Sequence, residues 1–275
     1  MNKHDYTVTF ACYNALSYTQ RCIESMQKHR NPLDRLVIVD NASTDGTQDY
    51  LRKLGEGVSI IINKSNLGCG VAWNQGALLF QSDWTIIMNN DVIVSEDWIN
   101  RLIDTAIELG VKVISPAGIN GNLDYDFDEF QVHAYNTMKS VHRIGGRSAV
   151  CMAIHKSVWN EVGYFRATPK LLGYEDTLFF HEIDKAKIQT AITGACWLHH
   201  YGSITQSLMK VERSLSQKDG LGYRYNYKLL HQGWLERKLK KMKDIKNKKK
   251  WREIELRDYK MTLHGVRFNG QFQWL

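Results

Sequence analysis

Carboxylate, amide and imidazole side chains lie at the ends of several apolar runs, where the edge of a sheet would hold them together. These residues are Asp40, Asn89, Asn90, Asp91, Glu175, Asp176, His199 and His200. A carboxylate and an imidazole together suit a hard divalent cation such as Mg²⁺ or Mn²⁺. A second carboxylate can take the proton of a hydroxyl group as a general base. We expect Asp91 as the metal carboxylate, one of the two histidines as the imidazole, and Asp176 as the base.

Each of these positions also has a purely structural interpretation. Asp40 at a strand end could cap the following helix, and the sequence Asn89-Asn90-Asp91 is turn-prone. The helix dipole by itself favours the acids Glu175 and Asp176 at a helix start. Two adjacent histidines could form a half-buried pair with satisfied hydrogen bonds. The catalytic interpretation therefore depends on the positions acting together.

The elements that would position these groups alternate along the first third of the chain. β-Branched and apolar runs predict strands at 6–12, 36–40, 58–62 and 84–88, and the stretches between them predict helices at 17–29, 47–54 and 71–81. Such alternation with short connections predicts βαβ units, and hence an α/β fold with a mostly parallel sheet flanked by helices. Ligands bind beyond the carboxyl ends of such strands, where Asp40 and Asp91 lie.

The pattern becomes less regular after Asp91. Strands are expected at 150–154 and 191–198, and helices at 156–162 and 175–187. Residues 118–146 show no clean period and contain many Gly, Asn and Asp residues, which predicts a mobile loop or an antiparallel excursion. From residue 217 onward the pattern is helical.

The composition indicates a folded protein with one large domain and an extension, or with two small domains. The chain has 275 residues, of which 43% are hydrophobic, so it can bury a sizeable core. Its five cysteines are scattered without a CxxC pair, which argues against a disulfide framework or a zinc knuckle and for a reducing compartment. We expect no signal peptide and no membrane-spanning segment. The expected protein is therefore soluble and cytoplasmic, or attached peripherally to the inner face of the membrane.

The positive charge is concentrated near the C-terminus. Residues 235–255 contain ten Lys or Arg and four Asp or Glu, whereas the whole chain has a formal net charge of +7. This segment could be a solvated helical face, or an amphipathic helix on the anionic inner surface of a membrane, since Trp234 and Trp251 flank the lysines. Nucleic acid is not expected as a partner, because no recognition motif accompanies the charge.

Five pieces of the sequence, in order, resemble the family 2 glycosyltransferases of the GT-A fold. They are Val39–Thr47, Asn66–Gly68, Met88–Val92, Gly173–Asp176 and His200–Ser203. The segment from Cys151 to Phe165 also resembles the strand and helix that precede the base in that family. The resemblance covers roughly residues 6–205. It implies a GT-A-like domain over 1–205, followed by a helical basic C-terminal extension over 206–275.

The resemblance further implies a reaction and a donor site. An inverting transfer would move a sugar from a nucleotide diphosphate to an acceptor hydroxyl, in the synthesis of a bacterial-type polysaccharide or lipid-linked glycan. Asp176 would be the base, and Asp91 with His200 would bind the metal ion, with Glu175, His199 and Asn89 as secondary candidates. The residues implied for the donor nucleotide are Ala11, Tyr13, Asp40, Asn66, Gly68, Asn74 and Asn90. Asp40 would bond the nucleobase and Tyr13 would pack on it.

Two departures from the family pattern and two rival functions remain. Asn89 and Asn90 stand where the family often has acids, and Trp73 stands where many relatives carry an arginine that contacts phosphate. A nucleotidyltransferase would need a basic, Gly-rich loop after the first strand, but the chain has Cys12–Leu16 there. A non-catalytic protein could bind a polyanion through the basic tail. The sequence leaves the sugar, the base, the acceptor and the oligomeric state open.

Overall fold

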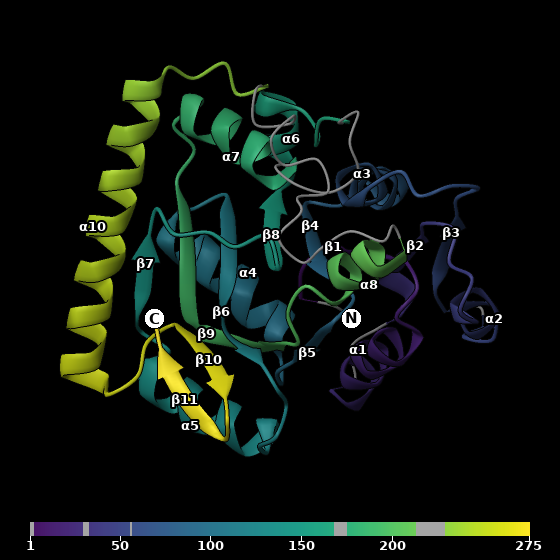
Figure 1. The fold of residues 1–275 in the computed structure, drawn as a ribbon, viewed down its shortest axis with the longest axis horizontal. Coiled ribbons are helices and arrows are strands. Elements are labelled where there is room, and N and C mark those ends of the chain that lie inside the picture. Colours follow the sequence, from purple (N-terminus) through teal and green to yellow (C-terminus); the bar gives the residue numbers. More distant parts are fainter. Residues whose placement is uncertain (1–2, 30–32, 56, 168–174, 213–228) are drawn as a thin grey trace.

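The computed structural model describes residues 3–29, 33–55, 57–167, 175–212 and 229–275, which form one sheet with helices on both faces (Figure 1). The strands are β1 (Tyr6–Cys12), β2 (Leu36–Asp40), β3 (Ser59–Ile62), β4 (Trp84–Asn89), β5 (Val92–Val94), β6 (Val113–Gly121), β7 (His142–Ile144), β8 (Cys151–His155), β9 (Thr190–His200), β10 (His264–Phe268) and β11 (Gln271–Trp274). The helices are α1 (Leu16–Lys28), η1 (Leu33–Arg35), α2 (Thr47–Arg52), α3 (Cys69–Phe80), α4 (Trp98–Leu109), α5 (Phe127–Met138), α6 (Lys156–Val162), α7 (Glu175–Lys185), α8 (Ile204–Glu212) and α10 (Trp234–Tyr259).

Strands β3, β2, β1 and β4 are adjacent and parallel, as the alternating sequence pattern predicts. Because successive side chains of a strand face opposite sides, Met88 packs in the core that includes α1 and α4, whereas Ile87 packs in the core that includes α3. Helix α3 lies so close to β1 that a Cβ atom at Gly76 would collide with Thr9 Oγ1. Position 76 therefore requires glycine, and the close packing fixes the helix over the sheet.

The sheet is mixed beyond β4. Strand β8 pairs antiparallel with both β4 and β6, and the long β9 runs parallel to β6 but antiparallel to β5 and β7. Antiparallel neighbours need no crossover helix, so the regular alternation of the first third of the chain is lost here.

The expectation of a mobile loop at 118–146 is wrong. Strand β6 continues to Gly121, α5 occupies much of the remainder, and β7 follows it. The alternative, an antiparallel excursion, describes β7, which pairs antiparallel with β9. Helix α5 begins where the Asp126 side chain accepts a hydrogen bond from Glu129 N (3.0 Å), and it buries Phe127, Ala134 and Met138. These apolar residues recur at helical spacing, but they are few. The polar residues between them make the helical period hard to recognise in the sequence.

The C-terminal part contains the expected basic helix and also returns to the sheet. After α10, strands β10 and β11 form a hairpin, and β10 pairs parallel with β6. The division at 205/206 therefore separates segments that share one sheet, and it stays a prediction. Residues 217–228 of the expected helical stretch, and Gly173 and Tyr174 at the expected start of α7, lie outside the described residues. None of the described helices has the length and apolar content that crossing a bilayer requires.

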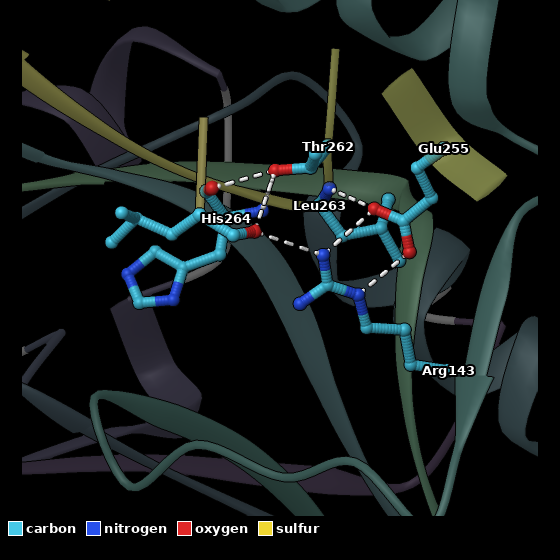
Figure 2. A network of polar contacts seen from close by, with 6 residues as sticks. Arg143, Glu255, Thr262, Leu263 and His264 are labelled. Atoms are coloured by element: carbon cyan, nitrogen blue, oxygen red, sulfur yellow. Dashed lines mark hydrogen bonds and ion pairs between the residues drawn. The ribbon is translucent and has the colours of Figure 1, made fainter. Parts of the chain in front are cut away.

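A buried ion pair anchors the end of α10 to the sheet (Figure 2). Arg143 of β7 donates from Nε to Glu255 Oε1 and from Nη2 to Glu255 Oε2, each at 2.7 Å. Leu263 N also donates to Glu255 Oε2 at 2.8 Å, and Arg143 Nη2 lies 3.3 Å from the carbonyl oxygen of Leu275. The pair thus connects β7, α10 and the two ends of the C-terminal hairpin.

Candidate functional site

A pocket of about 440 Å³ lies at the carboxyl ends of β1 and β4. The sequence-predicted site residues that line it are Ala11, Tyr13, Asn66, Asn89, Asn90, Asp91, Glu175, Asp176 and His200. Those outside its lining are Asp40, Gly68, Asn74 and His199. Parallel strands and the long β9 thus bring together residues that are far apart in the sequence.

Asp91 and His200 form a buried polar pair in this pocket. The antiparallel β5–β9 ladder pairs Val92 with His200, which places Asp91 beside the imidazole. Asp91 Oδ1 lies 3.2 Å from His200 Nε2, and Asn89 Nδ2 lies 3.3 Å from the same nitrogen. Asn90 instead donates from Nδ2 to Thr19 Oγ1 at 2.9 Å. Of the three consecutive polar residues at the carboxyl end of β4, Asn89 and Asp91 therefore face the imidazole.

Asn120 of β6 orients the imidazole of His200. Its Oδ1 atom lies 3.1 Å from His200 Nδ1 and can accept a hydrogen bond from Nδ1–H. In the tautomer with that bond, the Nε2 lone pair faces Asn89 Nδ2 and Asp91. This is the tautomer that a metal ligand needs. Asn120 Nδ2 in turn lies 3.0 Å from His264 Nε2 of β10. Sequence reasoning misses Asn120, because only the β6–β9 ladder pairs it with His200.

His199 faces the other side of β9, as neighbouring residues of a strand do. It is fully buried, and its Nδ1 lies 2.9 Å from the hydroxyl of Tyr125. Burial lowers the pKa of His199 to about 4, so the ring is neutral at pH 7. The geometry therefore favours His200 over His199 as the imidazole of the pocket.

Asp176 lies in the first turn of α7 and lines the same pocket. Its Oδ1 atom accepts a hydrogen bond from Thr177 N at 2.7 Å. Burial raises the pKa of the Asp176 carboxyl above its ordinary value. A carboxylate with a raised pKa is a stronger base than an exposed one, which suits proton abstraction from a hydroxyl group. Glu175 lines the pocket beside it.

Arg147 brings a cation to the pocket lining, which sequence reasoning also misses. Asp184 of α7 holds its guanidinium through Nη1 and Nη2, at 2.6 and 2.8 Å. Trp73, which occupies the position where the resemblance led us to expect an arginine, is buried and donates from Nε1 to Met88 O at 3.2 Å. The basic group of this site therefore comes from the turn between β7 and β8 and not from α3.

Helix α8 contributes to the pocket lining together with Tyr13, through Ile204, Thr205, Gln206 and Met209. Glu212 accepts hydrogen bonds from Tyr13 Oη (2.8 Å) and Asn14 Nδ2 (2.6 Å), and Met209 packs against Tyr13 and Cys69. Met209 Sδ also lies 3.9 Å from Asn66 Nδ2. Met209 and Glu212 carry no motif, so the sequence does not reveal that they contact two of the expected donor residues.

The predicted donor residues outside the lining make contacts within the fold. Asp40 is fully buried and accepts a hydrogen bond from Ser43 N at 3.0 Å. Gly68 has a φ of 86°, which favours glycine, and precedes α3. The Asn74 amide bonds both the carbonyl oxygen (2.8 Å) and the amide nitrogen (3.0 Å) of Phe165. Direct donor contacts by these residues stay predictions.

The residues of the pocket fit a divalent metal ion whose coordination is completed by a ligand. Asp91 and His200 supply one carboxylate and one imidazole, and among the described residues no cluster of three or more His, Cys, Asp or Glu suits a metal ion. Mg²⁺ in particular keeps several waters and binds through one or two carboxylates together with substrate phosphates. Two protein ligands leave the remaining coordination positions of such an ion to water or to the oxygen atoms of a ligand.

Three comparisons place the chain among known proteins. A family model described as "Glycosyl transferase family 2" matches residues 7–179. TuaG of Bacillus subtilis, named for teichuronic acid biosynthesis, is 27% identical over 35% of this chain and 39% of its own length. ExoO of Rhizobium meliloti, a succinoglycan biosynthesis protein, is 28% identical over 40% of this chain and 32% of its own. The matches thus span between about a third and two fifths of the length of these relatives.

Two solved structures share the fold. One is a crystal structure of GalNAc-T7 with UDP, GalNAc and Mn²⁺, with a TM-score of 0.57 and 15% identity over 72% of this chain and 44% of that one. The other is the mannosyltransferase PcManGT of Pyrobaculum calidifontis with GDP-Man and Mn²⁺, with a TM-score of 0.54 and 16% identity over 78% and 62%. At this identity the likeness shows the fold, which is the GT-A fold. Because the family model covers more than half of the chain, this protein belongs to glycosyl transferase family 2.

Proposed function

We propose that this protein transfers a sugar from a nucleotide diphosphate donor to an acceptor hydroxyl, with inversion at the anomeric carbon. The observation that carries the proposal is that Asp176 and the Asp91–His200 pair line one pocket at the carboxyl ends of β1 and β4. One group is suited to abstracting a proton, and the other to holding a cation against a diphosphate. The family 2 membership and the shared fold support the same reaction.

Asp176 performs the proton transfer in this mechanism. The acceptor oxygen bonds to the anomeric carbon on the face opposite the diphosphate, while the bond from that carbon to the diphosphate oxygen breaks. The acceptor proton passes to the Asp176 carboxylate, whose pKa is raised by burial. Asp91 and His200 would hold Mg²⁺ or Mn²⁺, and such an ion stabilises the negative charge of a leaving diphosphate. Arg147 adds a positive charge to the pocket lining.

The donor side of the site comprises the residues that follow β1 and precede α3. Ala11, Tyr13 and Asn66 line the pocket, so a nucleotide there would contact Tyr13 beside α8. We infer a glycan or lipid-linked acceptor, because TuaG and ExoO are named for the biosynthesis of teichuronic acid and succinoglycan. We further infer a cytoplasmic or inner-membrane-surface location, where nucleotide sugars are available to such an enzyme.

The substitution Asp176→Asn tests the proposal. It keeps the size of the side chain but removes the base, so sugar transfer should fall by roughly 10²–10⁴-fold. Thermal-shift measurements with UDP, dTDP, GDP and CMP, with and without Mn²⁺, should show the same stabilisation by one nucleotide in the wild type and the variant. Glu182→Gln removes a carboxylate from the same helix outside the pocket lining and should leave both measurements unchanged.

The outcomes separate the proposal from its rivals. A nucleotidyltransferase would release pyrophosphate from a nucleoside triphosphate and would not bind one diphosphate preferentially. A non-catalytic polyanion-binding protein would show steeply salt-dependent binding to oligonucleotides and no need for Asp176. Full transfer activity in Asp176→Asn would remove Asp176 from the mechanism, and the absence of any nucleotide effect would overturn the proposed donor class.

A further inference from the structure

The first part of α10 carries an apolar stripe that is open to solvent. Leu235, Leu239, Met242 and Ile245 recur at intervals of three or four residues, so they lie on one face of the helix. Each is between 57% and 60% exposed, and the adjacent Trp234 is 67% exposed. The chain around them is fully helical from Trp234 to Tyr259. A row of large apolar side chains on one helix is thus left in contact with water.

The opposite side of α10 contacts the rest of the protein. Lys240 Nζ donates to Asp184 Oδ2 of α7 at 2.8 Å, Arg143 lies over the ring of Trp251, and Glu255 is paired with Arg143 (Figure 2). At about 100° per residue, positions 240, 251 and 255 lie within about 60° of one another. The centre of the apolar stripe lies about 180° away from them. The stripe therefore faces directly outward.

This arrangement is the reverse of that of an ordinary surface helix, which turns its apolar stripe to the core and its charges to water. Here polar and charged side chains hold the helix to the sheet and to α7, and the leucines point away. Contiguous exposed apolar side chains commonly mark an interaction surface. No described part of the chain covers the stripe.

The charge of the same segment decides between possible occupants. Residues 234–250 hold nine Lys or Arg but only Glu236 and Asp244 as acids. A second copy of the helix would bring two lysine-rich flanks together, and like charges repel across such a contact. An anionic lipid surface accepts both features, since leucines enter the boundary between headgroups and acyl chains while lysines reach the headgroups. Each lysine or arginine near such a surface adds to this attraction.

We propose that the outward stripe of α10, with its flanking lysines, docks this protein on an anionic membrane surface. The inward side of the same helix reaches the pocket through Asp184, which bonds both Lys240 and the pocket residue Arg147. Docking through α10 therefore holds the pocket at a fixed orientation above the lipid headgroups. A lipid-linked acceptor would benefit from this orientation, and that consequence alone rests on the proposed function.

Vesicle sedimentation of the full chain tests the docking. The wild type should pellet with phosphatidylglycerol-containing vesicles but weakly with pure phosphatidylcholine. A variant with Leu235→Gln, Leu239→Gln, Met242→Gln and Ile245→Gln should bind the anionic vesicles more than about tenfold less, since a tenfold loss needs only about 1.4 kcal/mol. The control variant Ile107→Gln with Val132→Gln alters exposed apolar residues elsewhere and should bind like the wild type.

Three outcomes would overturn the docking proposal. The first is that the wild type does not pellet with anionic vesicles. The second is that the stripe variant pellets with them as strongly as the wild type does. The third is a wild-type dimer in sedimentation velocity that the stripe variant converts to a monomer, without vesicle binding. Nucleotide-induced thermal shifts measured on the same variants keep the docking and the proposed activity separable, because the stripe lies away from the pocket lining.

Discussion

Two buried pairs of a carboxylate and a basic side chain differ in how fully the carboxylate is hydrogen-bonded. Arg143 and Glu255 are 7% and 3% exposed, and His200 and Asp91 are 8% and 5% exposed. Burial alone therefore does not distinguish them. The first pair lies between β7 and α10 (Figure 2), and the second lies in the pocket.

The hydrogen bonds around the two carboxylates show the difference. Both Glu255 oxygens receive bonds of 2.7 Å from Arg143, and Leu263 N adds a third bond of 2.8 Å. The second oxygen of Asp91 lies 3.5 Å from Ile204 N, at the limit of a hydrogen bond. Asp91 thus keeps acceptor capacity that faces a cavity. A closed pair indicates a structural role, and an open pair beside a pocket indicates a ligand site.

The largest effect should follow from breaking the closed pair. Glu255→Ala leaves the Arg143 guanidinium buried without its carboxylate, and should lower the free energy of unfolding by about 3–5 kcal/mol. Urea unfolding followed by circular dichroism measures this loss. The double variant Arg143→Met with Glu255→Leu removes both charges and should recover most of the stability. A double variant as unstable as the single one would show that the pair contributes more than charge compensation.

Opening the second pair should affect activity more than stability. Asp91→Asn keeps the shape of the side chain but removes the negative charge that would hold a cation, so transfer should fall roughly 100-fold or more. The free energy of unfolding should change by less than about 1 kcal/mol, because the amide of the new side chain can still bond the His200 imidazole. Activity assays with and without added Mn²⁺, beside urea unfolding, check both. An equal loss of stability in Asp91→Asn and Glu255→Ala would remove the contrast.

Asn120 should show an intermediate effect, since it acts through His200. Asn120→Leu removes the acceptor for His200 Nδ1–H and frees the imidazole to take the wrong tautomer. The Mn²⁺ concentration for half-maximal activity should rise by roughly 10–100-fold, as for other residues that orient metal ligands. The rate at saturating Mn²⁺ should change less. Asn120→Ser, which keeps a hydrogen-bonding oxygen, serves as the milder control, and an unchanged metal requirement in both variants would contradict the positioning role.

The smallest effect concerns the acid limb of the pH profile. Burial raises the pKa of Asp176 above its ordinary value of 3.8, and the base works only when deprotonated. Transfer should therefore fall about tenfold per pH unit as the pH drops below this raised pKa. The residual activity of Asp176→Asn should lack that limb. A wild-type limb at or below pH 3.8, or the same limb in the variant, would assign the titration to another group.

The sequence by itself determined the parallel half of the sheet and the main polar groups of the site. Runs such as Leu36–Asp40 and Trp84–Met88 form strands because β-branched and apolar residues pack well on a buried sheet. Their carboxyl ends must meet at one edge, so Asp91 and the residues after β1 come together without further information. The basic helix can also be predicted from the local sequence, because its composition strongly favours helix formation.

Only the tertiary structure decided the contacts that join distant segments. The β6–β9 and β6–β10 ladders place Asn120 between His200 and His264, and no local pattern encodes strand order. The sequence also does not reveal α5 and the C-terminal hairpin, because each contains few apolar residues. Their packing depends on contacts between the two, such as the stacking of Phe130 on Phe272. Arg143 and Asp184 pair with Glu255 and Lys240, and these contacts decide that the apolar stripe of α10 faces outward. Helical periodicity shows that the apolar residues share one face, but it does not show what that face contacts.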